Sequence, residues 1–353
     1  MINYLVGTGY AWGMTSFVSE WAPSLGPRVR VLEYPEVFRA RSLETGTFVF
    51  ADLDVIPGRQ RAAAADLWKQ LEQAGGHVRL LNNPGRMLRR YELLQALNEA
   101  GINRFRAYRV EDRKRVERYP VFLKREDVHT GSLSGLLHST EEVERAIVRA
   151  VIRGNPPERL ILVEFCDTAD ANGIYRKFGA FSIGGRIVPR HMFVNTDWMV
   201  RAPGTYGAEL LAEEREYVFE NPHEKELSRI FEIANVDYGR IDYSFLGDSI
   251  QVWEINTNPT YLSRTSADPA RLALGIQVAE TLAEALAELD SVQPGQPIPI
   301  SIAAAAGAAA SVPRRPRRIP AALRRAYVAA EPLMLPARKL YLSRTDRRLR
   351  MLR

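Results

Sequence analysis

Two short runs of alternating polar and apolar residues carry three side chains with oxygen ligands. The runs, 239–245 and 251–256, predict the strands of a β-hairpin, because a period of two is the pattern of a half-buried strand. Asp242 lies on the first strand, and Glu254 and Asn256 lie on the second. Residues i and i+2 of a strand share a face, so Glu254 and Asn256 point the same way. If Asp242 lies across from them, three oxygen donors converge.

Such a set of oxygens suits a hard cation. Mg²⁺ usually binds through one or two protein carboxylates and takes further oxygens from substrate phosphates, and Mn²⁺ accepts similar ligands. Apolar Val252, Trp253 and Ile255 surround Glu254. These neighbours favour a partly buried acid, which needs a cation or hydrogen bonds. The hairpin therefore predicts a nucleotide–metal site, and a hairpin whose acids face solvent is the alternative.

A lysine before a loop of small residues predicts a phosphate contact. Lys124 ends an apolar strand at 121–124, and the loop 125–135 is rich in Gly, Ser and Thr. A cationic strand residue and the backbone N–H groups of an unhindered loop together suit a triphosphate. A solvated lysine beside this loop is the alternative.

The end of a strongly apolar strand could bind a nucleotide base. Backbone groups near Glu164, Phe165, Cys166 and Asp167 could hydrogen-bond an adenine edge, and nearby acids could bind ribose hydroxyls. An ordinary strand end is the alternative. We expect Cys166 to be a small buried residue rather than a nucleophile, because no basic residue adjoins it.

Two cations on successive predicted strands could meet a phosphoryl group. Lys177 lies on a strand at 175–183 and Arg190 on a strand at 186–194, joined by a Gly-Gly turn. Positive charge there would stabilise a transferring phosphoryl group. Surface salt bridges are the alternative for both residues.

The elements that position these residues alternate between strand and helix. Such alternation in the first 85 residues predicts a small parallel α/β unit. The segment 7–13 is expected to be a turn, because its glycine spacing differs from that of a dinucleotide loop. An N-cap at Thr140 is expected for one of the later helices. Strands are predicted at 3–6, 29–33, 48–51, 78–81, 105–110 and 160–165, and helices at 59–74, 86–99, from 140, 224–234 and 269–289.

The order of these features resembles the ATP-grasp superfamily over roughly residues 86–289. A strand lysine, a small-residue loop, a hinge strand and basic strands precede an Asp and a Glu-x-Asn motif. The resemblance implies that Asp242, Glu254 and Asn256 bind the metal and that Arg190 contacts the terminal phosphate.

The resemblance also implies roles for the earlier positions. Lys124 would contact phosphate, Glu164 and Cys166 would offer backbone contacts to adenine, and Asp167 or Asp170 would bind ribose. The family usually has a second lysine near the start of this region. This sequence has Arg89 and Arg90 there, and arginine would supply the charge with different geometry.

The fold implied by the resemblance is an α/β (α+β ATP-grasp) architecture in four parts. We expect an N-terminal domain at 1–85, a small lobe at 86–167 and a large lobe with the metal site at 168–290. An Ala/Pro-rich linker and a basic tail would occupy 291–353. The implied activity is that of an ATP- and Mg²⁺-dependent ligase. It would activate a small-molecule carboxylate as an acylphosphate, which an amine or a thiol then attacks.

The charge of the chain is concentrated in its last part. Residues 313–353 hold thirteen of the 48 Lys and Arg residues and two of the 42 acids, which leaves 35 basic and 40 acidic residues before them. Nucleic-acid binding by this mildly acidic body is therefore not expected. With one cysteine, no basic signal-peptide region and no apolar run of about 20 residues, the expected location is cytoplasmic.

Two other classes of function remain open. The chain could be a nucleotide-binding module without catalysis, although the intact acids argue against lost metal chemistry. It could also be an interaction or anchoring protein, because apolar residues alternate with arginines in the tail and could contact an anionic surface. A solvated tail is the alternative.

Overall fold

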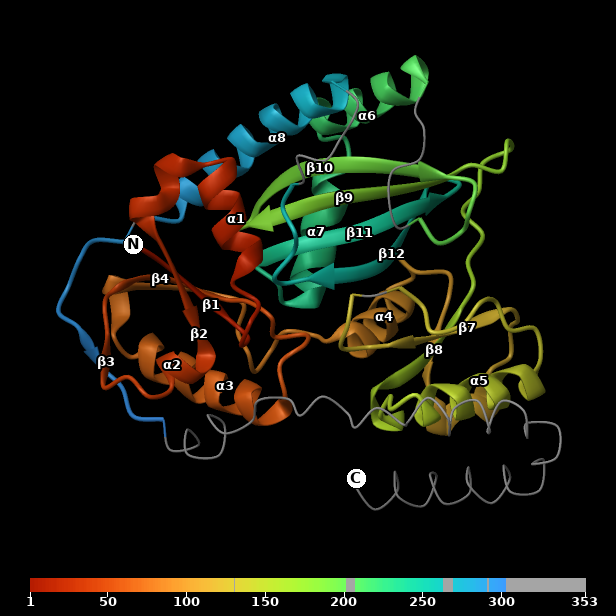
Figure 1. Ribbon diagram of the computed structural model, residues 1–353, viewed down its shortest axis with the longest axis horizontal. Helices are drawn as coiled ribbons and strands as arrows, with labels where there is room; N and C mark the ends of the chain where they lie inside the picture. The colour runs from red at the N-terminus through yellow and green to blue at the C-terminus, as the bar shows by residue number, and fades with distance from the viewer. Residues whose placement is uncertain (130, 201–206, 263–268, 291, 303–353) are drawn as a thin grey trace. The chain divides into compact units, whose positions relative to one another are not determined.

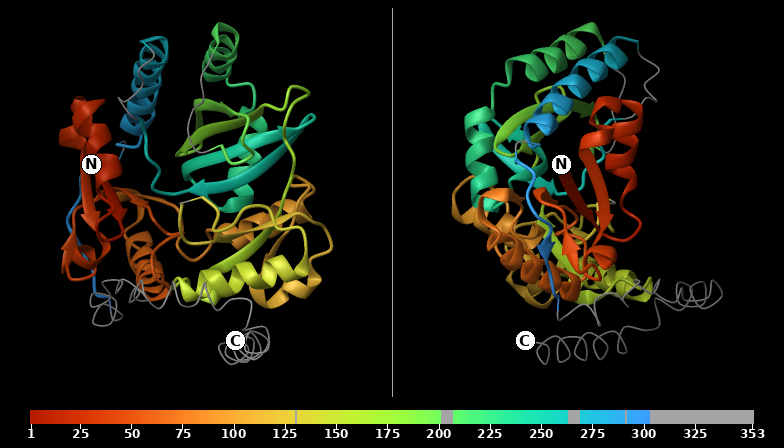
Figure 2. Two further views of the ribbon diagram at one scale, coloured as in Figure 1. Left: turned by 45° about the vertical axis from the view of Figure 1, so that its right-hand side comes forward. Right: turned by 90° about the vertical axis from the view of Figure 1, so that its left-hand side faces the viewer.

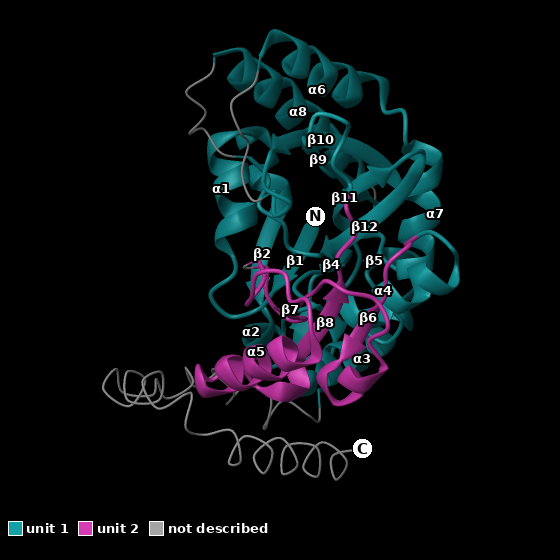
Figure 3. Ribbon diagram, turned by 90° about the vertical axis from the view of Figure 1, so that its right-hand side faces the viewer, with its two compact units in different colours: residues 1–102, 168–312 teal, residues 103–167, 313–353 magenta. Residues whose placement is uncertain are grey.

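The computed structural model describes residues 1–129, 131–200, 207–262, 269–290 and 292–302. These residues form two compact units, which Figure 3 distinguishes by colour. Unit 1 comprises Met1–Ile102 and the described part of 168–312, and unit 2 comprises Asn103–Asp167. The basic tail lies outside the described residues.

A parallel sheet forms the N-terminal part of unit 1. Its strand order is β2-β1-β4-β5, so the chain leaves β1 to one side and returns on the other. The carboxyl ends of β1 and β4 therefore lie at a topological switch point. The predicted strands of this region are confirmed. Their bounds are β1 (Ile2–Val6), β2 (Val29–Glu33), β4 (Gly46–Phe50) and β5 (Val78–Leu81).

Helices cover both faces of this sheet because its central strands are apolar on both sides. On one face, Tyr4 packs with Phe17 of α1 (Trp12–Glu20). On the other face, Leu5 packs with Leu67 of α3 (Gly58–Glu72). The turn expected at 7–13 leads directly into α1, a helix that the sequence did not predict.

The second sheet of unit 1 is antiparallel and has the order β10-β9-β11-β12. One face is apolar and packs on α7 (Glu224–Ala234). The other face carries the candidate site, and α8 (Pro269–Glu288) covers the end of it near Phe181. Figure 1 shows α8 and the unpredicted α6 (Ala208–Glu220) on the β10 side of this sheet, and Figure 2 shows the same arrangement from two further directions. The strands are β9 (Tyr175–Ile183), β10 (Arg186–Asn195), β11 (Tyr238–Leu246) and β12 (Ser249–Asn256).

Three details of unit 1 differ from expectation. Helix α4 (Arg90–Glu99) begins four residues later than 86. Residues 86–102, expected in the small lobe, belong to unit 1. The expected linker contains a packed segment, in which β13 (Ile298–Pro299) pairs with β3 (Ser42–Leu43) and the nearby isoleucines are buried. The remaining helix of this unit is α2 (Tyr34–Val37).

Unit 2 is a small antiparallel sheet with the order β6-β8-β7, covered on one face by α5. The N-cap of α5 is Ser139 rather than Thr140, because the Ser139 hydroxyl accepts the N–H of Glu142. The elements are β6 (Ala107–Arg109), β7 (Val121–Arg125), α5 (Thr140–Ile152) and β8 (Leu160–Glu164). In the part of the chain that the structure describes, no helix is long and apolar enough to cross a bilayer.

Candidate functional site

The predicted hairpin is formed by β11 and β12. Asp242 lies directly across from Glu254, and Asn256 lies across from Arg240. Opposed residues of an antiparallel pair point to the same face, so these four side chains share one face of the sheet. The three oxygen-bearing side chains therefore share a face, and their convergence on a metal ion stays a prediction.

Two basic side chains hold the carboxylate of Asp242. Arg240 Nε lies 2.9 Å from one oxygen and Lys177 Nζ lies 3.3 Å from the other. Burial would raise the pKa of this carboxyl, which is 4% exposed. The two cations outweigh burial and hold the pKa of Asp242 below its usual value. Asp242 is therefore a carboxylate at neutral pH, as a metal ligand must be.

Glu254 and Asn256 also have partners within unit 1. Arg90 Nη2 lies 2.5 Å from Glu254 Oε2, and the Arg90 side chain is buried. Asn256 Oδ1 accepts the backbone N–H of Asn258 at 2.8 Å, which orients its amide. Of the two arginines that the sequence left open, Arg90 lies beside this acid, and Arg89 occupies the N-cap position of α4.

The donor chemistry of these residues fits Mg²⁺. Carboxylates directly opposite each other on neighbouring strands repel, and a divalent cation bound by Asp242 and Glu254 would remove this repulsion. Within the described ranges, no three His, Cys, Asp or Glu side chains form a metal cluster. The hairpin itself offers two carboxylates and the amide of Asn256 as expected protein ligands, with phosphate oxygens or water completing the set.

Basic side chains gather around one aromatic ring on the same face. Lys177 Nζ lies 5.8 Å from the centroid of the Phe193 ring, and the guanidinium carbons of Arg190 and Arg271 lie 5.6 and 5.5 Å from it. These distances lie within the range of cation–π contacts. Phe193 thus holds three cations close together without neutralising them.

The charge of this face is positive. Arg271 pairs with Glu214 at 2.9 Å, and Asp242 is shared by two of the cations. With Arg240 and Arg90 included, five described cations lie on or against this face. They outnumber its three acids, Asp242, Glu254 and Glu214. Partly desolvated positive charge is stabilised by an anion, and phosphate groups match the donors of arginine well.

Arg190 lies at a β-bulge, where the register of β10 shifts between Pro189 and His191. Its guanidinium donates to the carbonyl oxygen of Tyr261 and to Nδ1 of His191, both at 2.7 Å. Burial, followed by repulsion from Arg240, lowers the pKa of Arg190 to about 9. A bound anion would reverse this shift. Arg190 therefore has the environment expected of a phosphate-binding residue.

A glycine makes room for the ring of His191. Gly179 lies across from His191, and a Cβ at Gly179 would lie 2.2 Å from the ring carbon Cε1. The ring is buried and lies 3.9 Å from the Phe193 ring, centroid to centroid. His191 in turn bonds Arg190, so this glycine supports the position of the candidate phosphate ligand.

We expect Gly179→Ala to lower the free energy of unfolding by about 1–3 kcal/mol, the usual cost of overpacking a filled core. Chemical denaturation measures this loss. Gly58→Ala is a suitable control, because no heavy atom lies within 4 Å of a Cβ there and alanine favours a helix. Equal stability of the two variants would contradict the packing argument.

Lys124 lies in unit 2, on the face of β7 that points away from α5. Val121 and Leu123 pack with α5, and Phe122 and Lys124 alternate with them on the strand. The loop after β7 runs back beside it, since Leu133 N–H bonds the Leu123 carbonyl at 2.7 Å. Lys124 is half-buried, and its phosphate contact stays a prediction.

The strand end after β8 is more constrained than expected. The buried carboxylate of Glu164 accepts the Tyr108 hydroxyl and the Arg106 N–H, both at 2.9 Å. The N–H groups of Glu164 and Phe165 bond the carbonyls of Arg106 and Pro120. The side chain of Glu164 thus stabilises unit 2. Backbone contacts of Glu164 and Cys166 with adenine stay a prediction.

The acids suggested for ribose differ in their environment. Asp167 is exposed. Asp170 pairs with Arg176 at 2.6 Å, and its other oxygen accepts the N–H groups of Asn172 and Ile174. Asp170 therefore stabilises a turn, and Asp167 is the better candidate for a ribose hydroxyl.

Cys166 is buried, and this burial raises the pKa of its thiol to about 11. Below that pH the thiol is neutral, so its thiolate fraction at pH 8 is about a hundredfold below that of an ordinary cysteine. We expect iodoacetamide to alkylate the native protein slowly at pH 8 and faster as the pH approaches 11. Mass spectrometry follows the reaction, with urea-unfolded protein as the control. Equal rates in the two samples would contradict this assignment.

Sequence reasoning missed several members of this face. Arg240 precedes Asp242 by two positions, so the strand period could have placed it on the same face. Phe193 likewise follows His191 by two positions on β10. Arg271 had no such signal, because it reaches the face from α8.

Comparisons with known proteins find structural similarity alone. No family model matches this chain, and no curated protein matches it. The chain is similar to the solved structure of D-alanine–D-alanine ligase from Bacillus anthracis, with 12% identity, 82% of this chain and 96% of that chain covered, and a TM-score of 0.47. It is also similar to a RimK domain protein ATP-grasp from Sphaerobacter thermophilus, with 15% identity, 81% of this chain and 100% of that chain covered, and a TM-score of 0.46. The similarity to D-alanyl-alanine synthetase A from Vibrio cholerae has 15% identity, covers 82% of this chain and 97% of that chain, and has a TM-score of 0.47.

Every TM-score is below 0.5, so these similarities assign no family to this chain. Identities of 12–15% carry no information about substrates. What this chain binds is therefore inferred from its own residues.

Proposed function

We propose that this chain is an ATP- and Mg²⁺-dependent ligase that activates a carboxylate as an acylphosphate. The observation that carries the proposal is the shared face of β9 to β12. There, paired acids suited to Mg²⁺ adjoin an excess of cations suited to phosphate. A magnesium–triphosphate complex is anionic overall, so it would satisfy both sets of residues.

Each residue of this face has a proposed task. Asp242, Glu254 and Asn256 would hold Mg²⁺, which supplies Lewis-acid stabilisation of phosphate oxygens when bound. Arg190 and Lys177 would bind phosphate oxygens and stabilise the charge that develops during transfer. In unit 2, Lys124 and the backbone around Cys166 are proposed as nucleotide contacts on the grounds of their chemistry.

The reaction needs no protein nucleophile. A carboxylate oxygen of the substrate would form a bond to the γ-phosphorus of ATP while the bond to ADP breaks, which gives an acylphosphate. An amine nitrogen or a thiol sulfur would then attack the acyl carbon, lose its proton and release phosphate. The protonated thiol of Cys166 agrees with this scheme, since a neutral buried thiol is a poor nucleophile.

The full chain would be tested for ADP release with ATP, MgCl₂ and a panel of carboxylic acids, each with and without amines and thiols. The expected result is ADP release that requires both Mg²⁺ and one class of acid. Hydroxylamine should convert the acylphosphate into a hydroxamate that mass spectrometry detects.

Two results would overturn this function. ATP binding without ADP release for any acid would identify a nucleotide-binding module. Absence of ATP binding in isothermal titration calorimetry would remove the nucleotide site altogether.

A further inference from the structure

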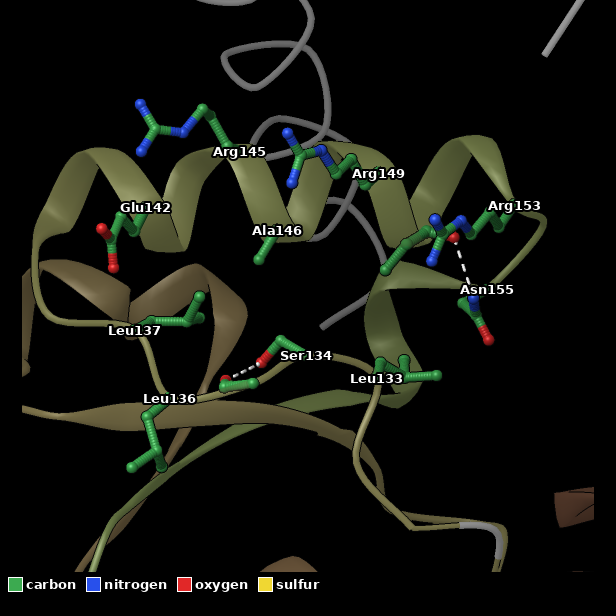
Figure 4. A pocket seen from close by; sticks show the side chains of 12 residues that line it. Leu133, Ser134, Leu136, Leu137, Glu142, Arg145, Ala146, Arg149, Arg153 and Asn155 are labelled. Carbon is green, nitrogen blue, oxygen red and sulfur yellow. Dashed lines mark hydrogen bonds between the residues drawn. The ribbon is translucent and has the colours of Figure 1, made fainter. Parts of the chain in front are cut away.

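Unit 2 contains a pocket that the proposed ligase chemistry does not use. Its volume is about 510 Å³, and its lining comes from α5 and the segment 133–137. Figure 4 shows α5 on one side of the pocket and this segment on the other. The volume lies within the range of roughly 300–1,000 Å³ that is usual for ligand pockets.

Three arginines follow one another along this side of α5. Arg145, Arg149 and Arg153 line the pocket and are exposed, and Figure 4 shows them in a row. Their spacing of four residues places them about 6 Å apart along the helix axis, at about 1.5 Å per residue. The row therefore presents positive charges at a regular interval.

The single acid of the lining has a structural task. Glu142 Oε2 accepts the backbone N–H of His138 at 2.7 Å, and its own N–H bonds the N-cap Ser139. This arrangement fixes the carboxylate at the first turn of α5. The net charge of the lining stays positive, and it is concentrated toward the C-terminal end of the helix.

The opposite wall of the pocket is apolar in part, with Leu133, Leu136 and the buried Leu137 in the segment beside β7. On the α5 side, Ala146 and the buried Ala150 add apolar atoms to the lining. A ligand of phosphates alone would gain nothing from these side chains. The pocket thus combines a row of cations with apolar surface.

We propose that this pocket binds an extended peptide in which acidic and apolar residues alternate. In an extended strand, residues i and i+2 share a face and lie about 6.6–6.8 Å apart. This distance matches the spacing of the arginines, whose planar guanidinium groups bind carboxylates through two hydrogen bonds. The apolar residues of such a peptide alternate with the acidic ones and would contact the apolar part of the lining.

The test is fluorescence anisotropy with the full chain and labelled acetyl-Glu-Leu-Glu-Val-Glu amide. A peptide of the same composition in the order Glu-Glu-Glu-Leu-Val tests the alternation, and its Gln analogue tests the charge. We expect both changes to weaken binding at least about tenfold, the scale of one charge-assisted hydrogen bond. Tripolyphosphate and a single-stranded oligonucleotide serve as competitors.

Variants locate the binding. The triple change Arg145→Gln, Arg149→Gln and Arg153→Gln should weaken peptide binding at least about tenfold. Arg30, Arg59 and Arg229 are exposed residues of unit 1, and their triple change to Gln removes the same charge as a matched control. Thermal melting of both variants verifies the fold.

Each contrary result overturns the proposal. Equal affinity of the pocket triple variant and the control would place the site elsewhere. Equal affinity for the alternating peptide and for the peptide with consecutive Glu residues would show that binding depends on charge alone. A third contrary result is that tripolyphosphate or the oligonucleotide displaces the labelled peptide completely at a lower concentration than unlabelled peptide does. That result would identify the pocket as a phosphate or nucleic-acid site.

Discussion

We expect Glu254→Gln to lower Mg²⁺-dependent ADP release by more than about a hundredfold. Substitution of a residue that only orients a metal ligand typically lowers metal affinity or activity about 10–100-fold. Substitution of a direct ligand should lower it further. Glutamine keeps an oxygen for Arg90, whose guanidinium lies 2.5 Å from the acid, but it removes the negative charge that attracts the cation. Steady-state ADP release across a series of Mg²⁺ concentrations measures the effect.

A second acid on the same hairpin supplies the control. Asp248 is exposed at the turn between β11 and β12, so Asp248→Asn removes one carboxylate without touching the site face. This variant should match the wild type. If Glu254→Gln keeps the wild-type dependence on Mg²⁺, the metal assignment is wrong, and the acids serve only to pair with arginines.

The second large effect is expected for Arg190→Gln. Loss of one preorganised donor to developing charge typically lowers kcat by about 10²–10³-fold, and the KM for ATP should rise as well. Removal of the guanidinium relieves its repulsion by Arg240 and Arg271, but it also leaves the Tyr261 carbonyl oxygen and His191 Nδ1 without their donor. Thermal melting should therefore accompany the kinetics to verify the fold of the variant.

The variant Arg190→Lys tests the charge itself. The burial and the repulsion by Arg240 that lower the pKa of Arg190 act on a lysine in the same way, and a lysine starts from a lower pKa. A cationic group is charged below its pKa and loses the charge as pH rises. The lysine variant should therefore lose activity at lower pH than the wild type.

Arg186 on the same strand serves as the control for both variants. It pairs with Glu288 at 2.7 Å, away from the Phe193 ring. Arg186→Gln should leave kcat and KM unchanged. Wild-type kinetics in Arg190→Gln would remove this residue from the phosphate site.

Much of this site could be predicted because it depends on the strand period. The residues of β11 and β12 alternate between apolar and polar, and a one-residue change of register would expose Ile241 and bury Asp242 on the apolar face. The pattern therefore determined which residues share a face. The same period placed Lys177 and Arg190 on neighbouring strands.

Local sequence patterns predicted secondary structure less well where the elements are short or irregular. Helix α1 follows a glycine-containing turn and has only nine residues, and its start carries no side-chain cap. The packed segment around Ile298 lies in a Pro- and Ala-rich region. Both are stabilised by contacts with distant parts of unit 1, which a local pattern does not contain.

The sequence by itself determined the two strands of the hairpin, the shared direction of Glu254 and Asn256, and the presence of basic residues on the strands before them. The register of the hairpin then placed Asp242 across from Glu254. Only the tertiary structure decided which cations meet which acids. Arg90 reaches Glu254 from α4, and Arg271 reaches the Phe193 ring from α8. The period of a strand specifies the direction of a side chain, whereas the partner of a buried charge depends on how distant elements pack.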